Sequence, residues 1–187
     1  YINSYRKKKA VFIISNKTSK SKNELYSLRR KIISFFAKKN DNFLDLYGFG
    51  WQKDYNNLNL KNIYKGEIKS KNPVMMKYDF AFAIENEYSN EPYFTEKILD
   101  AMICGCIPIY YGCNDIDKYI PKDLYIDFSK FENLSSLKNY LLNLTEEEIL
   151  NWRKSIIDFV SRNTYNNNIF SEGWGSDVAS QCLKLYN

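Results

Sequence analysis

Hydrophobic positions along the chain alternate between short strand-like runs and longer stretches with helical spacing. Strands are predicted over residues 10–15, 43–48, 80–84, 107–111 and 124–127. Helices are predicted over about 22–39, from Thr95 onward, over 135–143, from Thr145 to about 162, and over 177–186. Capping boxes at Ser21/Glu24 and Thr145/Glu148 are expected to begin two of them. Because strands alternate with helices, the sequence predicts an α/β fold, a Rossmann-like parallel sheet with flanking helices in a single domain over 1–187.

The segment from Asp79 to Gly112 is the most informative part of this pattern. Its strand is an unbroken apolar run from Phe80 to Ile84, which is typical of a parallel strand covered on both faces. The run stops at Glu85-Asn86, and a helix follows after a short polar loop. Open α/β sheets bind their ligands at the carboxyl ends of such strands, so a site is expected here.

The helix that begins at Thr95 has an unusual first turn. Glu96 is favoured there by the positive end of the helix dipole, whereas Lys97 is not. An anion held between the free N–H groups and the ammonium would remove this cost. A solvated Glu-Lys pair is the alternative, but the position directly after a buried strand favours ligand binding.

These residues resemble the donor-binding signature of the α1,3-fucosyltransferases, glycosyltransferase family 10. The family pattern is Phe-x-x-x-Phe-Glu-Asn, a short loop, Tyr-x-Thr-Glu-Lys, a small-residue turn and Pro-Val/Ile. The corresponding residues here are Phe80, Phe82, Glu85-Asn86, Tyr93-Phe94-Thr95-Glu96-Lys97, Gly105, Ile107-Pro108-Ile109 and Gly112. Ile84 replaces the usual Phe before Glu-Asn, and the loop before Tyr93 is one residue longer than usual.

A second resemblance lies upstream, at Ser15-Asn16. The family places an Arg near the start of the next helix, where it contacts the donor diphosphate, and Lys22 stands at that place here. A Lys can neutralise a phosphate but cannot make the bidentate fork of an Arg. Lys20 is an alternative for this role, and a solvated basic loop is the other interpretation.

The resemblance implies the C-terminal half of a GT-B glycosyltransferase fold and a role for each matching residue. Glu96 would accept hydrogen bonds from the ribose hydroxyls, and Lys22 and Lys97 would neutralise the diphosphate. Tyr93 would pack or bond near the nucleotide, and Asn86 and Glu85 would contact the fucose or the adjacent phosphate. Glu85 is the candidate catalytic residue beside them, its alternative being a buried carboxylate satisfied by loop amides.

The implied reaction is the inverting transfer of L-fucose from GDP-fucose to a GlcNAc- or glucose-type glycan acceptor. No metal or other cofactor is expected. The family's N-terminal acceptor-binding domain, which supplies the usual general base, is expected to be absent from this chain, so the isolated chain can be inactive. The alternatives are a non-catalytic nucleotide-sugar- or glycan-binding module that needs a partner domain, and an enzyme of the same fold with another nucleotide sugar.

Composition narrows the function classes. The 187 residues include no His, which excludes Ser-His-Asp hydrolases, Cys-His proteases and His-ligated zinc sites. The four cysteines lack Cys-x-x-Cys spacing, and Cys104, Cys106 and Cys113 are expected to pack as small apolar residues. No apolar run approaches the roughly 20 residues of a membrane span. Localisation stays open, between the cytoplasm or a membrane surface in a bacterial-like protein and the Golgi lumen in a eukaryotic-like one.

Charge is divided unevenly along the chain. Residues 1–80 hold 18 Lys/Arg and 6 Asp/Glu, a net charge of +12, whereas 81–187 carry −7. A basic first half suits an anionic ligand. Nucleic acid is not expected, because the aromatic residues lie in apolar-periodic segments and no nucleic-acid motif is present. Asn-x-Ser/Thr sequons occur at Asn16, Asn133 and Asn143, and Asn16 is expected to stay unmodified beside the site.

Overall fold

The fold was analysed in a computed structural model, which describes residues 6–39, 42–90 and 93–165. The strands are β1 (Lys7–Ile13), β2 (Leu44–Tyr47), β3 (Tyr78–Ser89), β4 (Ile107–Cys113) and β5 (Ile126–Asp127). The α-helices are α1 (Tyr26–Lys39), α2 (Asn72–Met75), α3 (Glu96–Ile103), α4 (Leu134–Asn143) and α5 (Glu146–Tyr165). The helix expected over 177–186 lies outside the described residues.

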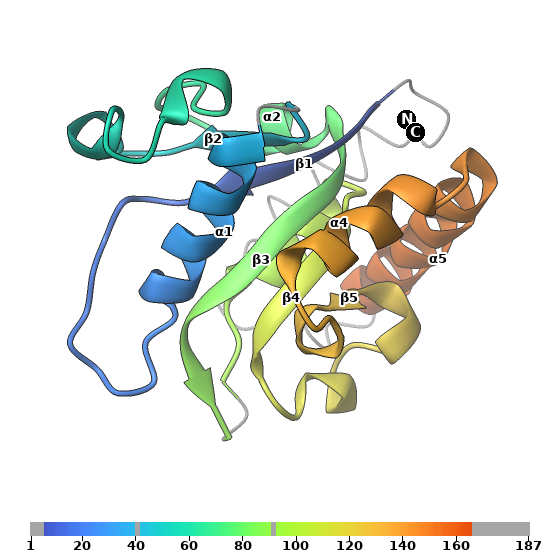
Figure 1. Cartoon of the computed structure of the whole chain (residues 1–187). Coiled ribbons are helices and arrows are strands. Elements are labelled where there is room, and N and C mark those ends of the chain that lie inside the picture. The colour runs from blue at the N-terminus through green and yellow to red at the C-terminus, as the bar shows by residue number, and fades with distance from the viewer. Residues whose placement is uncertain (1–5, 40–41, 91–92, 166–187) are drawn as a thin grey trace.

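The five strands form one parallel sheet in the order β2-β1-β3-β4-β5 (Figure 1). Ala10 of β1 pairs with Leu44 and Phe80, and Phe80 pairs with Ile107. After β1 the chain runs outward to β2 and then returns to place β3 on the other side of β1. The strand order therefore reverses between β1 and β3, and the predicted Rossmann-like α/β fold is confirmed.

Helices cover both faces of the sheet because side chains of a strand point alternately to its two faces. On one face, Phe36 of α1 packs against Phe43 and Phe82, with ring centroids 5.8 and 6.0 Å apart. On the other face, Ala101 of α3 packs in a second apolar cluster with Val11 and Ala81. This two-sided burial is the reason for the unbroken apolar run in β3.

Two of the differences from the predicted element boundaries lie beside the expected site. β3 continues past the expected strand 80–84 to Ser89, and α1 begins at Tyr26 instead of residue 22. Both differences have one cause, because residues 23–25 pair with the end of β3 through an antiparallel bridge between Glu24 and Glu87. Leu25 N donates to Asn86 O at 2.8 Å, and Tyr88 N donates to Asn23 O at 2.8 Å. The capping box at Ser21/Glu24 is wrong for the same reason, and Glu24 instead accepts a bond from Ser27 N at 2.9 Å.

The second predicted capping box is confirmed. Thr145 N donates to the Glu148 carboxylate at 2.7 Å, and Glu148 N donates to Thr145 Oγ1 at 3.2 Å. The structure also shows a box that the sequence analysis missed, between Asn133 and Ser136 at the start of α4.

The structure bears on the cysteines and on the membrane-span expectation. Cys104, Cys106 and Cys113 are buried and no disulfide joins them, which agrees with the prediction that they pack as small apolar residues. Within the described ranges, no helix combines the length and the apolar character needed to cross a bilayer.

Candidate functional site

A cavity of about 780 Å³ lies at the strand reversal between β1 and β3. Its walls come from the end of β1, the segment after β2, α1, and the loop and first turn around Thr95. In an open parallel sheet, loops diverge at the point where the strand order reverses, which leaves a crevice for a ligand. The tertiary structure thus places a cavity where the sequence predicts a site.

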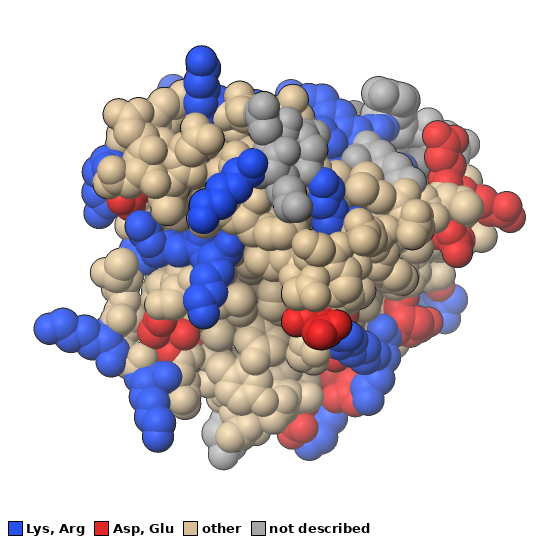
Figure 2. Space-filling model, in the orientation of Figure 1, with Lys and Arg blue, Asp and Glu red and all other residues tan. Residues whose placement is uncertain are grey.

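The cavity is basic. The Lys and Arg residues among its lining are Lys17, Arg29, Lys69, Lys71 and Lys97. Two carboxylates, Glu67 and Glu96, also line it. Figure 2 shows Lys and Arg side chains gathered over the side of the molecule that carries α1 and the loop before it. This balance favours an anionic ligand.

Lys97 is held in place by a small buried network. Its Nζ lies 3.1 Å from Glu85 Oε2 and 2.7 Å from Thr95 Oγ1, and its side chain is 16% exposed. Glu85 is fully buried and also accepts bonds from Thr95 N at 2.8 Å and Thr95 Oγ1 at 2.7 Å. Glu85 does not line the cavity. Its placement is that of a buried carboxylate satisfied by loop donors, and it contacts the cavity lining through Thr95 and Lys97.

Thr95 has an extended backbone at the start of α3, but its hydroxyl does not cap the helix. The hydroxyl is bonded to Glu85 and Lys97 instead. The first N–H groups of α3 therefore receive no side-chain cap from Thr95, and they lie beside an ammonium group at the cavity wall. Helix N–H groups that the N-cap side chain does not cap, together with a fixed cation, are a favourable arrangement for a phosphate.

Glu96 lies on the same wall. Lys71 Nζ is 3.6 Å from Glu96 Oε1 and 3.0 Å from Asp100 Oδ2. Burial opposes ionisation of Glu96, but the neighbouring Lys97 and Lys71 hold its pKa below the usual value. Burial raises the pKa of Asp100 despite its bond to Lys71. Glu96 is thus an ionised acceptor at the cavity, suited to hydroxyl groups.

The structure adds Arg29 to the site, a residue that the sequence analysis missed. Arg29 is 3% exposed and lines the cavity, where its Nη2 donates to Ile84 O at 2.6 Å and to Asn86 Oδ1 at 3.0 Å. Its Nε is buried without a hydrogen-bond partner. Burial lowers the pKa of this guanidinium, an effect that Glu85 partly offsets. The signal in the sequence was a charged residue on the apolar face that Leu25 and Ile32 define.

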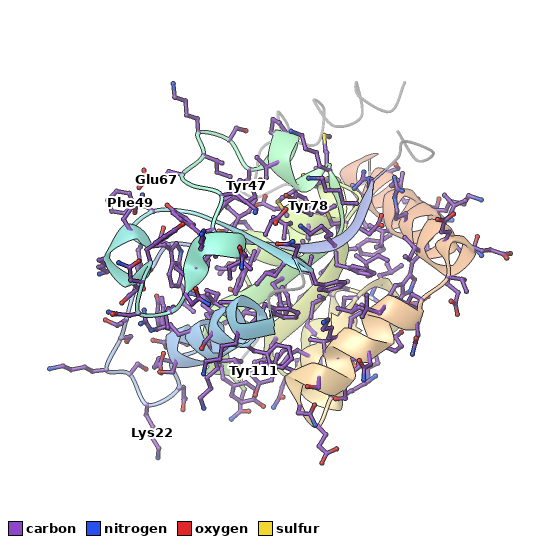
Figure 3. All side chains as sticks on the ribbon, turned by 45° about the horizontal axis from the view of Figure 1, so that its top comes forward. Lys22, Tyr47, Phe49, Glu67, Tyr78 and Tyr111 are labelled. Carbon is purple, nitrogen blue, oxygen red and sulfur yellow. The ribbon has the colours of Figure 1, made fainter. Side chains whose placement is uncertain are left out.

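The remaining predicted site residues differ in whether they line the cavity. Asn86 and Tyr93 line the cavity, and Tyr93 is 46% exposed. Lys22 is exposed and is not among the lining residues. Figure 3 shows Lys22 extending outward, away from Phe49 and Glu67, which line the cavity. At this end of the sheet, Arg29 is therefore the guanidinium that the folded chain brings to the cavity.

Asn16 of the Ser-Asn pair has a structural role. Its Nδ2 donates to Gly50 O at 3.1 Å and to Asp54 Oδ2 at 2.6 Å, and its Oδ1 accepts from Arg30 at 2.8 Å. These bonds hold the segment after β2, which forms one side of the cavity. Ser15, the preceding residue, lines the cavity itself.

Across the ranges that the structure describes, no cluster of three or more Cys, Asp or Glu side chains is arranged to hold a metal ion.

Comparison with known proteins assigns the chain to a family. The family model described as "Glycosyltransferase family 10 (fucosyltransferase) C-term" matches residues 3–174. An α-(1,4)-fucosyltransferase of Arabidopsis thaliana is 36% identical over 76 residues, covering 41% of this chain and 19% of that protein. A probable xyloglucan galactosyltransferase of the same plant is 33% identical over 88 residues, covering 42% and 17%.

The fold is also that of solved glycosyltransferases. A crystal structure of an α1,3-fucosyltransferase with GDP-fucose aligns with a TM-score of 0.54 at 18% identity, covering 99% of this chain and 47% of that one. The chain therefore spans less than half the length of these proteins.

Proposed function

The chain belongs to glycosyltransferase family 10, and we propose that it is the donor-binding part of an inverting α1,3-fucosyltransferase. In this proposal L-fucose moves from GDP-fucose to a hydroxyl of a GlcNAc- or glucose-type sugar. The donor occupies the basic cavity between β1 and β3.

One observation carries the proposal: Lys97 is fixed at the uncapped start of α3, on the wall of a basic cavity at the strand reversal. Glu85 and Thr95 hold the Lys97 ammonium before any ligand arrives. A diphosphate that binds there meets a cation and helix N–H groups already in position, so little reorganisation is needed.

The other cavity residues contact different parts of the donor. Arg29 and Lys71 supply further positive charge for the diphosphate, and Glu96 accepts hydrogen bonds from the ribose hydroxyls. Asn86, oriented by Arg29, faces the fucose or the adjacent phosphate.

In the transfer step, the bond between fucose C1 and the β-phosphate oxygen breaks while the acceptor oxygen attacks the opposite face of C1. Negative charge then develops on the departing GDP, and Lys97, Arg29 and the α3 N–H groups stabilise it without a metal ion. The proton of the acceptor hydroxyl goes to a general base on the acceptor-binding domain of the whole protein. Glu85 acts as a positioning residue for Lys97.

Thermal shifts with a panel of nucleotides test the donor assignment. GDP and GDP-fucose at about 100 times Kd stabilise the folded chain by about 2.7 kcal/mol. For a chain of this size, that corresponds to a rise in Tm of about 5–11 °C. UDP, ADP and UDP-galactose are expected to give smaller shifts at the same concentrations.

UDP-galactose belongs in the panel because one relative is a probable galactosyltransferase. A larger shift with UDP-galactose than with GDP-fucose would replace fucose by another donor sugar. Equal shifts for all nucleotides, or none, would refute the donor site. The variant Lys31→Ala, which removes an exposed cation of α1 outside the cavity, should respond like the wild type.

A further inference from the structure

A second pocket, of about 200 Å³, opens at the carboxyl ends of β4 and β5. Its lining includes four tyrosines, Tyr88, Tyr110, Tyr111 and Tyr125, and the polar residues Asn114 and Asp127. It shares no lining residue with the donor cavity. Figure 3 shows Tyr111 well separated from Phe49 and Glu67 of that cavity. The two pockets are therefore distinct sites on the same edge of the sheet.

The tyrosine rings form a supported aromatic wall. The Tyr88 and Tyr111 centroids lie 5.6 Å apart, and Phe128 packs 5.8 Å from the Tyr111 ring. Tyr110 and Tyr125 meet edge to face at 5.9 Å and are almost fully buried. Tyr88 and Tyr111 are only partly buried, so part of each ring remains accessible.

Hydrogen-bonding groups stand beside these rings. Asn114 is exposed, and its Oδ1 accepts a bond from the Tyr88 hydroxyl at 2.5 Å. Asp127 Oδ1 accepts from Ser129 N at 2.9 Å and from Ser129 Oγ at 2.6 Å. Within the described part of the chain, no donor bonds the second oxygen, Asp127 Oδ2, which leaves an acceptor at the pocket.

The chemistry of this lining differs from that of the donor cavity. None of the described residues that line it is a Lys or an Arg, whereas five line the donor cavity. An anionic ligand is therefore disfavoured beside Asp127. Aromatic surface with a few oriented polar groups suits a neutral ligand that has both apolar faces and hydroxyls. A sugar ring has this character.

The size and position of this pocket further restrict the kind of ligand that it can bind. The volume lies below the roughly 300–1,000 Å³ of pockets that enclose a whole drug-sized ligand, so the pocket suits a single ring of a larger molecule. Gly112 lines this pocket, and a Cβ on it would lie 2.4 Å from Glu85 Cγ. Glu85 in turn holds Lys97 in the donor cavity. The Glu85 side chain thus lies against a lining residue of each pocket.

We propose that the tyrosine pocket at the ends of β4 and β5 binds one ring of the neutral acceptor glycan. The ring packs against Tyr111 and Tyr88, and its hydroxyls bond to Asp127 and Asn114. The proposal rests on the function proposed above, because it assigns this ligand as the acceptor of the same transfer.

Saturation-transfer difference NMR on the chain tests the pocket, with the methyl β-glycosides of GlcNAc and glucose as probes. Saturation of the ring protons is expected with at least one probe, and saturating GDP should not displace it. Tyr111→Ala is expected to weaken binding about threefold to tenfold. Asn114→Ala, a change at an exposed side chain, should also weaken it. Tyr140→Ala removes an exposed tyrosine that packs against Phe131 outside the pocket, and it should leave the signal unchanged.

Three outcomes would overturn the proposal: no saturation transfer with either probe, loss of the signal on adding GDP, or an unchanged signal in both Tyr111→Ala and Asn114→Ala. The GDP thermal shift of each variant is measured on the same samples. A normal GDP shift without glycoside binding refutes the tyrosine pocket alone. Glycoside binding without a GDP shift refutes the donor assignment and leaves a saccharide-binding pocket.

Discussion

Replacing Lys97 by alanine should have two separable effects, one on folding and one on donor binding. In the folded chain the Lys97 ammonium lies 3.1 Å from Glu85, which is fully buried. Among the described residues, Lys97→Ala leaves the Thr95 N–H and hydroxyl as the hydrogen-bond donors to that carboxylate. Breaking a buried ion pair from one side costs about 3–5 kcal/mol. For a chain of this size, the expected fall in Tm is roughly 6–20 °C.

The effect on donor binding has a different origin. Lys97→Ala removes a charge-assisted contact to the diphosphate, which is worth about 1.5–3 kcal/mol. That loss corresponds to a Kd for GDP about 10- to 150-fold higher. Isothermal titration calorimetry below the Tm of the variant measures it without interference from unfolding.

A double variant separates the two effects. Lys97→Ala combined with Glu85→Gln removes the stranded charge, and a Gln side chain can still accept from Thr95 N and donate to Thr95 Oγ1. The double variant should therefore regain most of the lost Tm while its GDP affinity stays as low as in Lys97→Ala. Two results would contradict this reasoning. The first is a double variant that regains wild-type GDP affinity, and the second is an unchanged Tm in Lys97→Ala.

Three further changes test neighbouring parts of the site. Arg29→Met should raise the Kd for GDP, measured by calorimetry, at least about tenfold, because a charge-assisted contact is lost. An equal or larger rise with Lys22→Ala would show that Lys22 contacts the diphosphate. Gly112→Ala should lower the free energy of unfolding, measured with urea, by about 1–3 kcal/mol, because its Cβ would lie 2.5 Å or less from two carbons of Glu85. An unfolding free energy equal to that of the wild type would show that this contact relaxes freely. Asn16 should stay unglycosylated when the chain is secreted from a eukaryotic host, because its amide nitrogen is bonded to Gly50 and Asp54. A glycan found at Asn16 by glycopeptide mapping, with GDP binding retained, would contradict its placement.

Local patterns predicted the elements that depend on near neighbours. The apolar run that forms β3 and the helix start at Thr95 could be predicted, because burial on both faces and helix geometry leave a signal in adjacent residues. The capping box at Thr145 has the same character. At Ser21 the same spacing failed, because residues 23–25 pair with the end of β3, more than 60 residues away along the chain.

Of the candidate site, the sequence by itself determined which strand end carries the site and that Lys97 stands at a helix start beside it. The family resemblance rested on these same residues. The tertiary structure decided what each side chain faces. It placed Glu85 in a buried network and brought Arg29 to Asn86 across 57 residues of sequence. It also assembled the tyrosine pocket from the ends of three strands. The physical reason is that the sequence pattern fixes the face on which a side chain lies, whereas its partners depend on which strands become neighbours in the sheet.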